Sequence, residues 1–434
     1  MKLKTHYKGK KYMKKRFGYK NAYNGRLFLL CWIAYFSTYI CRLNFSAVMP
    51  ELLGSGAFTQ SETAAVSSAF FICYGAGQLF SGVLCDKISA RLLIFAGVLF
   101  SGLSNLFIFL FSESYTALLV LWALNGIAQS LVWAPILKLA GDYYNEGEKV
   151  KFGVDISTTV PLGTLASYGV SLVTLLFAEW RYVFAVCGAL VIIAAVYWFI
   201  GTSGLKKIPK VENRMDEAIQ TAPTAVSGKK LVKILLISGT AALMIPIAIQ
   251  GTLKDSVTQW IPTFLEGNYN MGTSLSLLLT MVLPVINVTG AYLAKALNKK
   301  LKNELATSAA FFGIAAAFLI LLMTAGTKIA VLALICMAGI TNSMFAINVM
   351  LITMVPLHFP KYGRTGTVGG LLNAVAYIGC GLLNMGAGAI LETDDGWRAL
   401  FILWLALAAA AAIITILCVK PWKKFTHVPN SYGE

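Results

Sequence analysis

Residues 181–201 read RYVFAVCGALVIIAAVYWFIG, an apolar run whose single charge is the arginine at its start. A helix crosses the hydrocarbon core of a bilayer in about 20 residues, so this run predicts a transmembrane helix. Residues 397–419, WRALFILWLALAAAAAIITILCV, open with a tryptophan-arginine pair, as Trp180 and Arg181 do at the start of the first run, and are apolar to their end. Two such runs, about half a chain apart, indicate a membrane protein with an internal repeat.

The rest of the chain repeats this pattern of long apolar runs between short polar segments. The runs predict twelve transmembrane helices, near residues 27–53, 62–84, 92–112, 115–140, 153–178, 181–201, 234–265, 273–296, 305–325, 329–357, 364–391 and 397–419. The composition agrees, because 57% of the residues are hydrophobic and only 13% are charged, about half the charged share of a soluble chain. We therefore expect an all-α, multi-pass protein of the cell membrane.

The distribution of positive charge predicts the orientation of the helices. The net charge is +17, and ten Lys and Arg lie in residues 1–26, where there is no Asp or Glu. Of the 36 Lys and Arg, 31 fall in segments that would be cytoplasmic if the basic N-terminus is inside, and three fall in external loops. This bias places both termini in the cytoplasm and accounts for the net charge without a nucleic-acid partner.

A polar segment at the midpoint divides the chain into two similar halves. We expect a basic tail (1–26), a six-helix bundle (27–201), a cytoplasmic linker (202–233), a second six-helix bundle (234–419) and a C-terminal tail (420–434). Two pairs of matching segments, EWRYVF at 179–184 with GWRALF at 396–401, and Arg42 before Pro50 with Lys254 before Pro262, lie at nearly one offset. Parallel repeats of this kind place a substrate site near mid-membrane, between the halves.

Two cations remain inside the predicted helices, Arg42 and Lys254. A cation at a helix centre costs about 2.5–3.5 kcal/mol, and such residues usually face a water-filled cavity and serve function. The alternative for each is a structural ion pair or a side chain that snorkels to the interface, and for Lys254 the neighbouring Asp255 is a candidate partner. Two cations at matching places suit a doubly charged anion, a phosphate monoester or a dicarboxylate.

Polar side chains share a helix face with each cation. Tyr35 and Tyr39 precede Arg42 at helical spacing, as Gln250 precedes Lys254. Hydroxyl and amide donors beside a cation suit an oxyanion. Most other intramembrane amides are expected to bond between helices.

Two acids are candidates for coupling transport to protons. Asp155 lies near the cytoplasmic start of the fifth span, where a helix-start acid near the interface is the more common use. Asp255 lies beside Lys254. The three histidines fall in tails or loops, and we find no metal-ligand or nucleophile–base spacing in the spans, so neither a metal, a cofactor nor an enzymatic activity is expected.

The loop between the second and third spans resembles a known motif. Residues 82–91, GVLCDKISAR, are similar to the G-x-L-x-D-[RK]-x-G-R motif of the major facilitator superfamily, with departures at positions 89 and 90. The matching residues are Gly82, Asp86, Lys87 and Arg91. The resemblance implies a twelve-helix fold of two pseudo-symmetric bundles, usually monomeric, in which this loop gates the cytoplasmic side.

Other patches resemble one family within it, the organophosphate:phosphate antiporters that carry glycerol 3-phosphate and hexose 6-phosphates. They are YICRLNFSAVMPEL (39–52), GIAQSLVWAP (126–135), WIPTFL (260–265) and Gly366-Thr367 with Tyr377. The resemblance implies that Arg42 and Lys254 bind a phosphoryl group, with hydrogen bonds from Tyr35, Tyr39 and Tyr377.

Three positions depart from that family. Gln78 stands where the glycerol-phosphate carriers have a binding lysine, Thr158 where they have a histidine, and Gln259 where they have an acid. We therefore expect an alternating-access transporter that exchanges a phosphorylated metabolite for inorganic phosphate. Two alternatives remain: proton-coupled symport of an organic carboxylate such as a sugar acid, and a transporter-like membrane sensor of a sugar phosphate.

Overall fold

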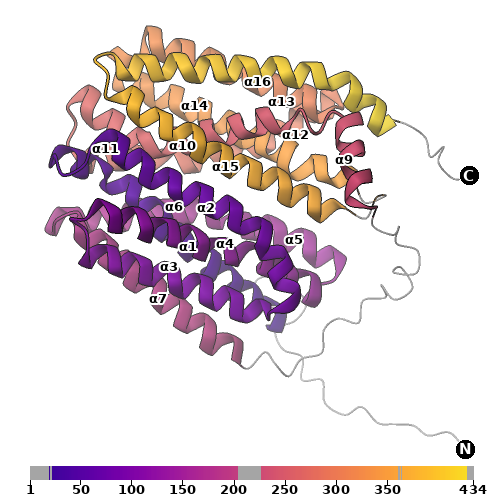
Figure 1. Cartoon of the computed structure of the whole chain (residues 1–434), viewed down its shortest axis with the longest axis horizontal. Helices are drawn as coiled ribbons and strands as arrows, with labels where there is room; N and C mark the ends of the chain where they lie inside the picture. The colour runs from indigo at the N-terminus through magenta and orange to yellow at the C-terminus, as the bar shows by residue number, and fades with distance from the viewer. Residues whose placement is uncertain (1–18, 20–21, 204–225, 360–361, 363, 428–434) are drawn as a thin grey trace, which may run out of the picture.

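A computed structural model describes residues 19, 22–203, 226–359, 362 and 364–427, and the regular elements in these ranges are helices (Figure 1). One group of helices comprises α1 (Ala22–Gly54), α2 (Gln60–Lys87), α3 (Ala90–Leu110), α4 (Tyr115–Tyr143), α5 (Glu146–Ser157), α6 (Thr159–Phe177) and α7 (Arg181–Ser203). The other comprises α9 (Gly228–Ile237), α10 (Met244–Tyr269), α11 (Thr273–Thr280), α12 (Val282–Leu301), α13 (Glu304–Thr324), α14 (Ala330–Asn348), α15 (Thr365–Leu391) and α16 (Gly396–His427), with short turns η2 (Gly326–Lys328), η3 (Val349–Met354) and η4 (Val355–His358). The two groups lie side by side in Figure 1.

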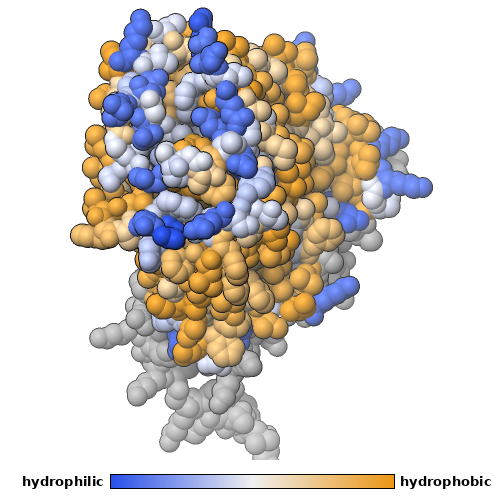
Figure 2. All heavy atoms as spheres, turned by 60° about the vertical axis from the view of Figure 1, so that its left-hand side comes forward, coloured by the Kyte–Doolittle hydropathy of each residue, from blue (hydrophilic) through white to orange (hydrophobic). Residues whose placement is uncertain are grey.

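Eleven helical stretches are long and apolar enough to cross a membrane, in agreement with a multi-pass membrane protein. Figure 2 shows hydrophilic residues gathered at one end of the molecule and apolar side chains along its flank. Many large apolar side chains are exposed on the surface, including Phe177, which is 86% exposed. The helix α10 is absent from this set, although it is also 26 residues long and packs among the others. Its middle carries Lys254 and Asp255.

Two of the expected spans are interrupted, and each interruption lies just before a proline. The run 153–178 breaks at Thr158 between α5 and α6, and the run 273–296 breaks at Met281 between α11 and α12. Pro161 and Pro284 stand three residues after these breaks. Proline lacks the N–H that would bond the carbonyl four residues earlier, so one hydrogen bond of the helix is lost there and a break is favoured.

The expected span 234–265 was wrong at its start. The short helix α9 begins at Gly228, inside the expected linker, and the chain turns at Gly239 with a φ of +79° before α10 begins at Met244. Pro246 lies in the first turn of α10, where its missing N–H costs nothing. An apolar run alone did not reveal this turn because the turn residues are themselves apolar or small.

The two groups of helices meet mainly along α2 and α15, which pack closely because glycines line the contact. A β-carbon at Gly388 would lie 2.6 Å from the carbonyl oxygen of Gln60, and one at Gly381 would lie 2.9 Å from that of Ser68. At the end of this contact the exposed Glu392 carboxylate accepts a hydrogen bond of 2.9 Å from the backbone N–H of Ser61, which lowers the pKa of Glu392. The contact therefore runs from the first turn of α2 into the middle of the molecule.

Within the second group, Gly251 lets α10 approach α15. A β-carbon at Gly251 would lie 2.2 Å from the backbone oxygen of Ala376. We expect Gly251→Ala to push the two helices apart and to lower the unfolding temperature of the detergent-purified protein by several degrees, because overpacking against a backbone atom costs about 1–3 kcal/mol. Gly267→Ala on the same helix is the control, since no atom lies within 4 Å of its β-position. Equal stability of the two variants would contradict the prediction.

Candidate substrate site

A kink in α1 holds Arg42 in the interior of the first group. The backbone of Cys41 leaves the helical region (φ −92°, ψ 20°), so its carbonyl oxygen is available to other donors. That oxygen accepts hydrogen bonds from Asn125 Nδ2 at 2.7 Å and from Gln129 Nε2 at 3.1 Å, both on α4. Side chains that enter the ladder in this way are a usual cause of a sharp kink. The next residue, Arg42, thereby lies against α4, and its Nε donates to Gln129 Oε1 at 2.9 Å.

Aromatic rings surround the Arg42 guanidinium. Its Cζ lies 4.4 Å from the ring centroid of Tyr74, 4.8 Å from that of Tyr39 and 5.5 Å from that of Phe70. The residue is only 9% exposed, and its Nη2 is buried with no hydrogen-bond partner among the described residues. A buried, charged N–H without an acceptor costs about 1–3 kcal/mol or more, so this donor is suited to an anionic ligand.

Lys254 lies on α10 in the other group, and Tyr377 of α15 lies between the two cations. Lys254 Nζ is 5.3 Å from the Tyr377 ring centroid, and that ring packs edge-on against Tyr74 at 4.7 Å. Lys254 Nζ also lies 3.3 Å from Asp255 Oδ2, so the structural ion pair expected as the alternative is present. The Lys254 side chain is 13% exposed, so this pair is largely buried.

These residues bring a cation from each group of helices to a common aromatic cluster. A series of contacts runs from Arg42 through the rings of Tyr74 and Tyr377 to Lys254. An anion held here would receive a planar, two-pronged donor from one side, an ammonium from the other and hydroxyl groups from tyrosines. The arrangement contains two cations and several hydrogen-bond donors, so it can bind an oxyanion and link the two groups of helices through it.

Of the other predicted site residues, Tyr35 belongs to the cluster and two amides connect the helix groups. The hydroxyl of Tyr35 lies 3.4 Å from that of Tyr39. Gln78 Oε1 accepts a hydrogen bond of 2.5 Å from Asn373 on α15. Gln259 donates to Ser67 Oγ on α2. Both glutamines therefore bond across the contact between the groups in this conformation.

Thr158 and Asp155 lie apart from the two cations. Thr158 is exposed, and its Oγ1 accepts a hydrogen bond of 2.9 Å from Trp32 Nε1. Asp155 forms an ion pair with Lys151 and accepts a hydrogen bond of 3.1 Å from the hydroxyl of Tyr19. The buried Tyr19 precedes α1, so Asp155 ties the chain before the first helix to α5.

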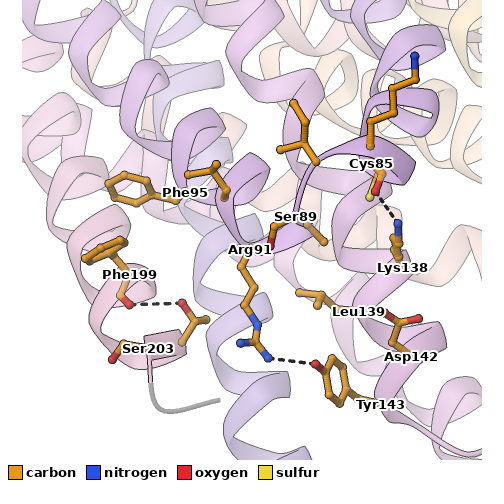
Figure 3. A pocket seen from close by; sticks show the side chains of 15 residues that line it. Cys85, Ser89, Arg91, Phe95, Lys138, Leu139, Asp142, Tyr143, Phe199 and Ser203 are labelled. Atoms are coloured by element: carbon orange, nitrogen blue, oxygen red, sulfur yellow. Dashed lines mark hydrogen bonds between the residues drawn. The ribbon is translucent and has the colours of Figure 1, made fainter. Parts of the chain in front are cut away.

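Residues 85 and 87–91 of the segment that resembles the superfamily motif line a cavity of about 730 Å³ at the ends of α2, α3, α4 and α7 (Figure 3). Arg91 Nη2 donates to the Tyr143 hydroxyl at 3.1 Å, and Lys138 Nζ donates to the Cys85 carbonyl at 2.5 Å. Lys87 is exposed and also lines the cavity. Gly82 has open space at its β-position, and the side chain of Asp86 is outside the described residues.

Neither Tyr74 nor Phe70 was predicted as a site residue, and Gln129 was expected to bond between helices and to belong to the patch at 126–135. Phe70, Tyr74 and Gln78 are spaced four residues apart on α2, so a shared face with Gln78 was a usable signal. Gln129 carries no such signal, because its role depends on the kink at Cys41 of another helix. Asn125 was not singled out at all.

Comparisons with known proteins agree with this architecture. The model of the Major Facilitator Superfamily matches residues 31–384. Among curated proteins, the membrane sensor protein UhpC of Escherichia coli is 27% identical over 39% of this chain and 39% of its own length. A probable hexose phosphate transport protein of Chlamydia muridarum is 26% identical over 43% of this chain and 40% of its own length. These matches therefore span about two fifths of the curated relatives.

A solved structure covers nearly the whole chain. A bacterial homologue of the human lysosomal transporter Spinster, in an inward-facing and unoccupied conformation, has a TM-score of 0.76 over 94% of this chain and 99% of its own, at 16% identity. That likeness concerns the fold alone. The family model covers more than half of the chain and confirms the resemblance carried by residues 82–91. The chain belongs to the major facilitator superfamily.

Proposed function

We propose that this protein is a secondary transporter of a phosphorylated metabolite, which it exchanges for inorganic phosphate by alternating access. The observation that carries the proposal is the buried Arg42 Nη2, which lacks an acceptor among the described residues and faces an aromatic cluster shared with Lys254. The curated relatives support a phosphate ester as the ligand, because one of them is named as a probable hexose phosphate transport protein. Arg42 and Lys254 hold the phosphoryl group, and Tyr35, Tyr39 and Tyr377 donate hydrogen bonds.

The proposed architecture is two pseudo-symmetric six-helix bundles, 27–201 and 234–419, joined by a cytoplasmic linker at 202–233 and flanked by cytoplasmic tails at 1–26 and 420–434. The helix α10, with its central charges, is the twelfth span. The distribution of Lys and Arg supports cytoplasmic termini. In that orientation the α2–α15 contact closes the external side, and the conformation is inward-facing. The protein works as a monomer.

The electrostatics of Arg42 support obligate exchange. Moving between inward- and outward-facing states requires the site to pass through a closed form without bulk water. A buried cation with an unsatisfied N–H is costly in such a form, and a bound anion removes much of that cost. Closure is therefore favoured when the site is loaded, so one anion must enter for each that leaves.

The likeness to a membrane sensor favours one rival, a protein that binds a phosphorylated sugar without moving it. The site could serve either role, since both begin with binding. Transport is preferred because alternating access uses an interface between two bundles, and the cations of this site come from both.

The test combines binding and flux on purified protein. We expect inorganic phosphate and hexose 6-phosphates at 100-fold their Kd to stabilise the protein by about 2.7 kcal/mol, and sugar acids to have no such effect. In liposomes loaded with phosphate, external labelled phosphate should enter, and in liposomes without internal anion it should not. Stabilisation with no flux would establish the sensor, and accumulation driven by a pH gradient with empty liposomes would establish proton-coupled symport.

A further inference from the structure

Three charged side chains meet around the aromatic cluster, and their net charge is smaller than that of two cations. Arg42 and Lys254 carry one positive charge each, but Asp255 Oδ2 lies 3.3 Å from Lys254 Nζ. Adjacent residues of a helix point in different directions, so the side chains of Lys254 and Asp255 must bend together to make this contact. With both partners ionised, the net charge of the cluster is +1.

Among the residues that the structure describes, Lys254 is the one cation that pairs with Asp255. Its Oδ2 is buried and accepts no hydrogen bond from the described residues. The titratable groups that face it are Lys254 on its own helix and Tyr377 and Cys380 on α15, while Arg42 and Tyr39 on α1 lie beyond the tyrosine rings. Phenols and thiols are uncharged at neutral pH, so no further charge offsets the carboxylate.

The net charge of +1 determines which anion neutralises the cluster. A singly charged anion brings the cluster to zero, whereas a doubly charged anion leaves one negative charge in a site that must close away from water. Uncompensated charge in such an environment is strongly disfavoured. A phosphate monoester exists in both forms near neutral pH, since its second pKa is about 6.

We propose that Asp255 sets the charge selectivity of the site, so that the protein carries the singly charged form of a phosphate ester in preference to the doubly charged form. The proposal rests on the proposed function and refines it. Arg42 supplies the main attraction for the anion. Lys254 is partly neutralised by Asp255, and it therefore orients the ligand more than it attracts a second negative charge.

The experiment uses two inhibitors of phosphate exchange in liposomes that differ in charge. Glucose 6-sulfate keeps a single charge at all relevant pH values, and glucose 6-phosphate changes from mostly one charge at about pH 5 to mostly two at about pH 8. For the wild-type protein we expect inhibition by glucose 6-phosphate to weaken by about tenfold over this range relative to glucose 6-sulfate. Equal or stronger inhibition by the doubly charged form would overturn the proposal.

Variants of Asp255 assign the effect to this carboxylate. Asp255→Asn should remove the preference, so that glucose 6-phosphate at about pH 8 inhibits at least tenfold better relative to glucose 6-sulfate than it does in the wild type. Asp255→Glu should retain the wild-type order. An unchanged ratio in Asp255→Asn would also overturn the proposal, and if that variant does not fold, the wild-type comparison still decides.

Failure of the proposed phosphate exchange would give a different result from failure of the charge selectivity. If the wild-type protein exchanges no phosphate and neither ester stabilises it, the proposed function is wrong and this inference falls with it. If phosphate is exchanged but the ratio of the two inhibitors does not depend on pH, only the charge selectivity is wrong.

Discussion

Replacing Arg42 with methionine is expected to weaken phosphate binding by about 10- to 100-fold and to reduce phosphate exchange by at least as much. A hydrogen bond to a charged group contributes about 1.5–3 kcal/mol, and each 1.4 kcal/mol corresponds to a factor of ten. Methionine keeps an unbranched apolar stem among Tyr39, Phe70 and Tyr74, so the aromatic cluster stays filled. The measurements are the phosphate-induced rise in unfolding temperature and the exchange flux in liposomes.

Two comparisons separate a binding role from a structural one. Arg42→Lys keeps the charge but loses the planar guanidinium, so we expect intermediate binding. Arg42→Met without ligand should be at least as stable as the wild type, because a buried cation with an unpartnered N–H has been removed. A normal phosphate response in Arg42→Met would exclude Arg42 from the site, and a large loss of stability without ligand would indicate a structural role.

The helices could be predicted because every segment that crosses a bilayer must meet the same chemical requirements. A segment that crosses hydrocarbon must satisfy its backbone internally and expose apolar side chains, and both requirements can be read from composition. Helix α10 is the instructive case. It was predicted despite Lys254 and Asp255, although it is not among the eleven stretches that are long and apolar enough to cross a membrane.

The breaks and kinks within the helices could not be predicted, because an apolar run of sequence does not indicate where the backbone leaves helical geometry. Pro161 and Pro284 were visible, but a proline also occurs inside α4 at Pro135 without dividing the helix. The kink at Cys41 follows no proline and depends on Asn125 and Gln129, which lie more than 80 residues further along the chain. Tertiary contacts of this kind are outside the reach of local sequence patterns.

The candidate site could be predicted in part because charge inside a membrane is rare and therefore informative. That argument led to Arg42, Lys254 and Asp255. It could not find Tyr74, since tyrosines are common in membrane helices and only the meeting of α2 with α1 and α15 gives this one a role. Nor could it foresee that Gln78 and Gln259 would bond across the helix groups.

Replacing Gly381 with leucine is expected to reduce transport by about 10- to 100-fold while phosphate binding is retained. A β-carbon at Gly381 would lie 2.5 Å from Ile72 Cγ1 and 2.9 Å from the Ser68 carbonyl oxygen, both on α2. Overpacking costs about 1–3 kcal/mol and falls here on a contact between the two helix groups, which a transporter must open and close in every cycle. The conformation described above would be depopulated by the corresponding factor.

Gly386→Leu is the matched control, because Gly386 lies on the same helix with open space at its β-position. It adds the same side chain to α15 without touching α2, so both flux and binding should stay near wild-type values. The contrast distinguishes two views of the α2–α15 contact. If the contact is permanent scaffolding, Gly381→Leu should lower stability and abolish binding together. If it opens during transport, the helices can separate without unfolding either group, so binding survives and only turnover is lost.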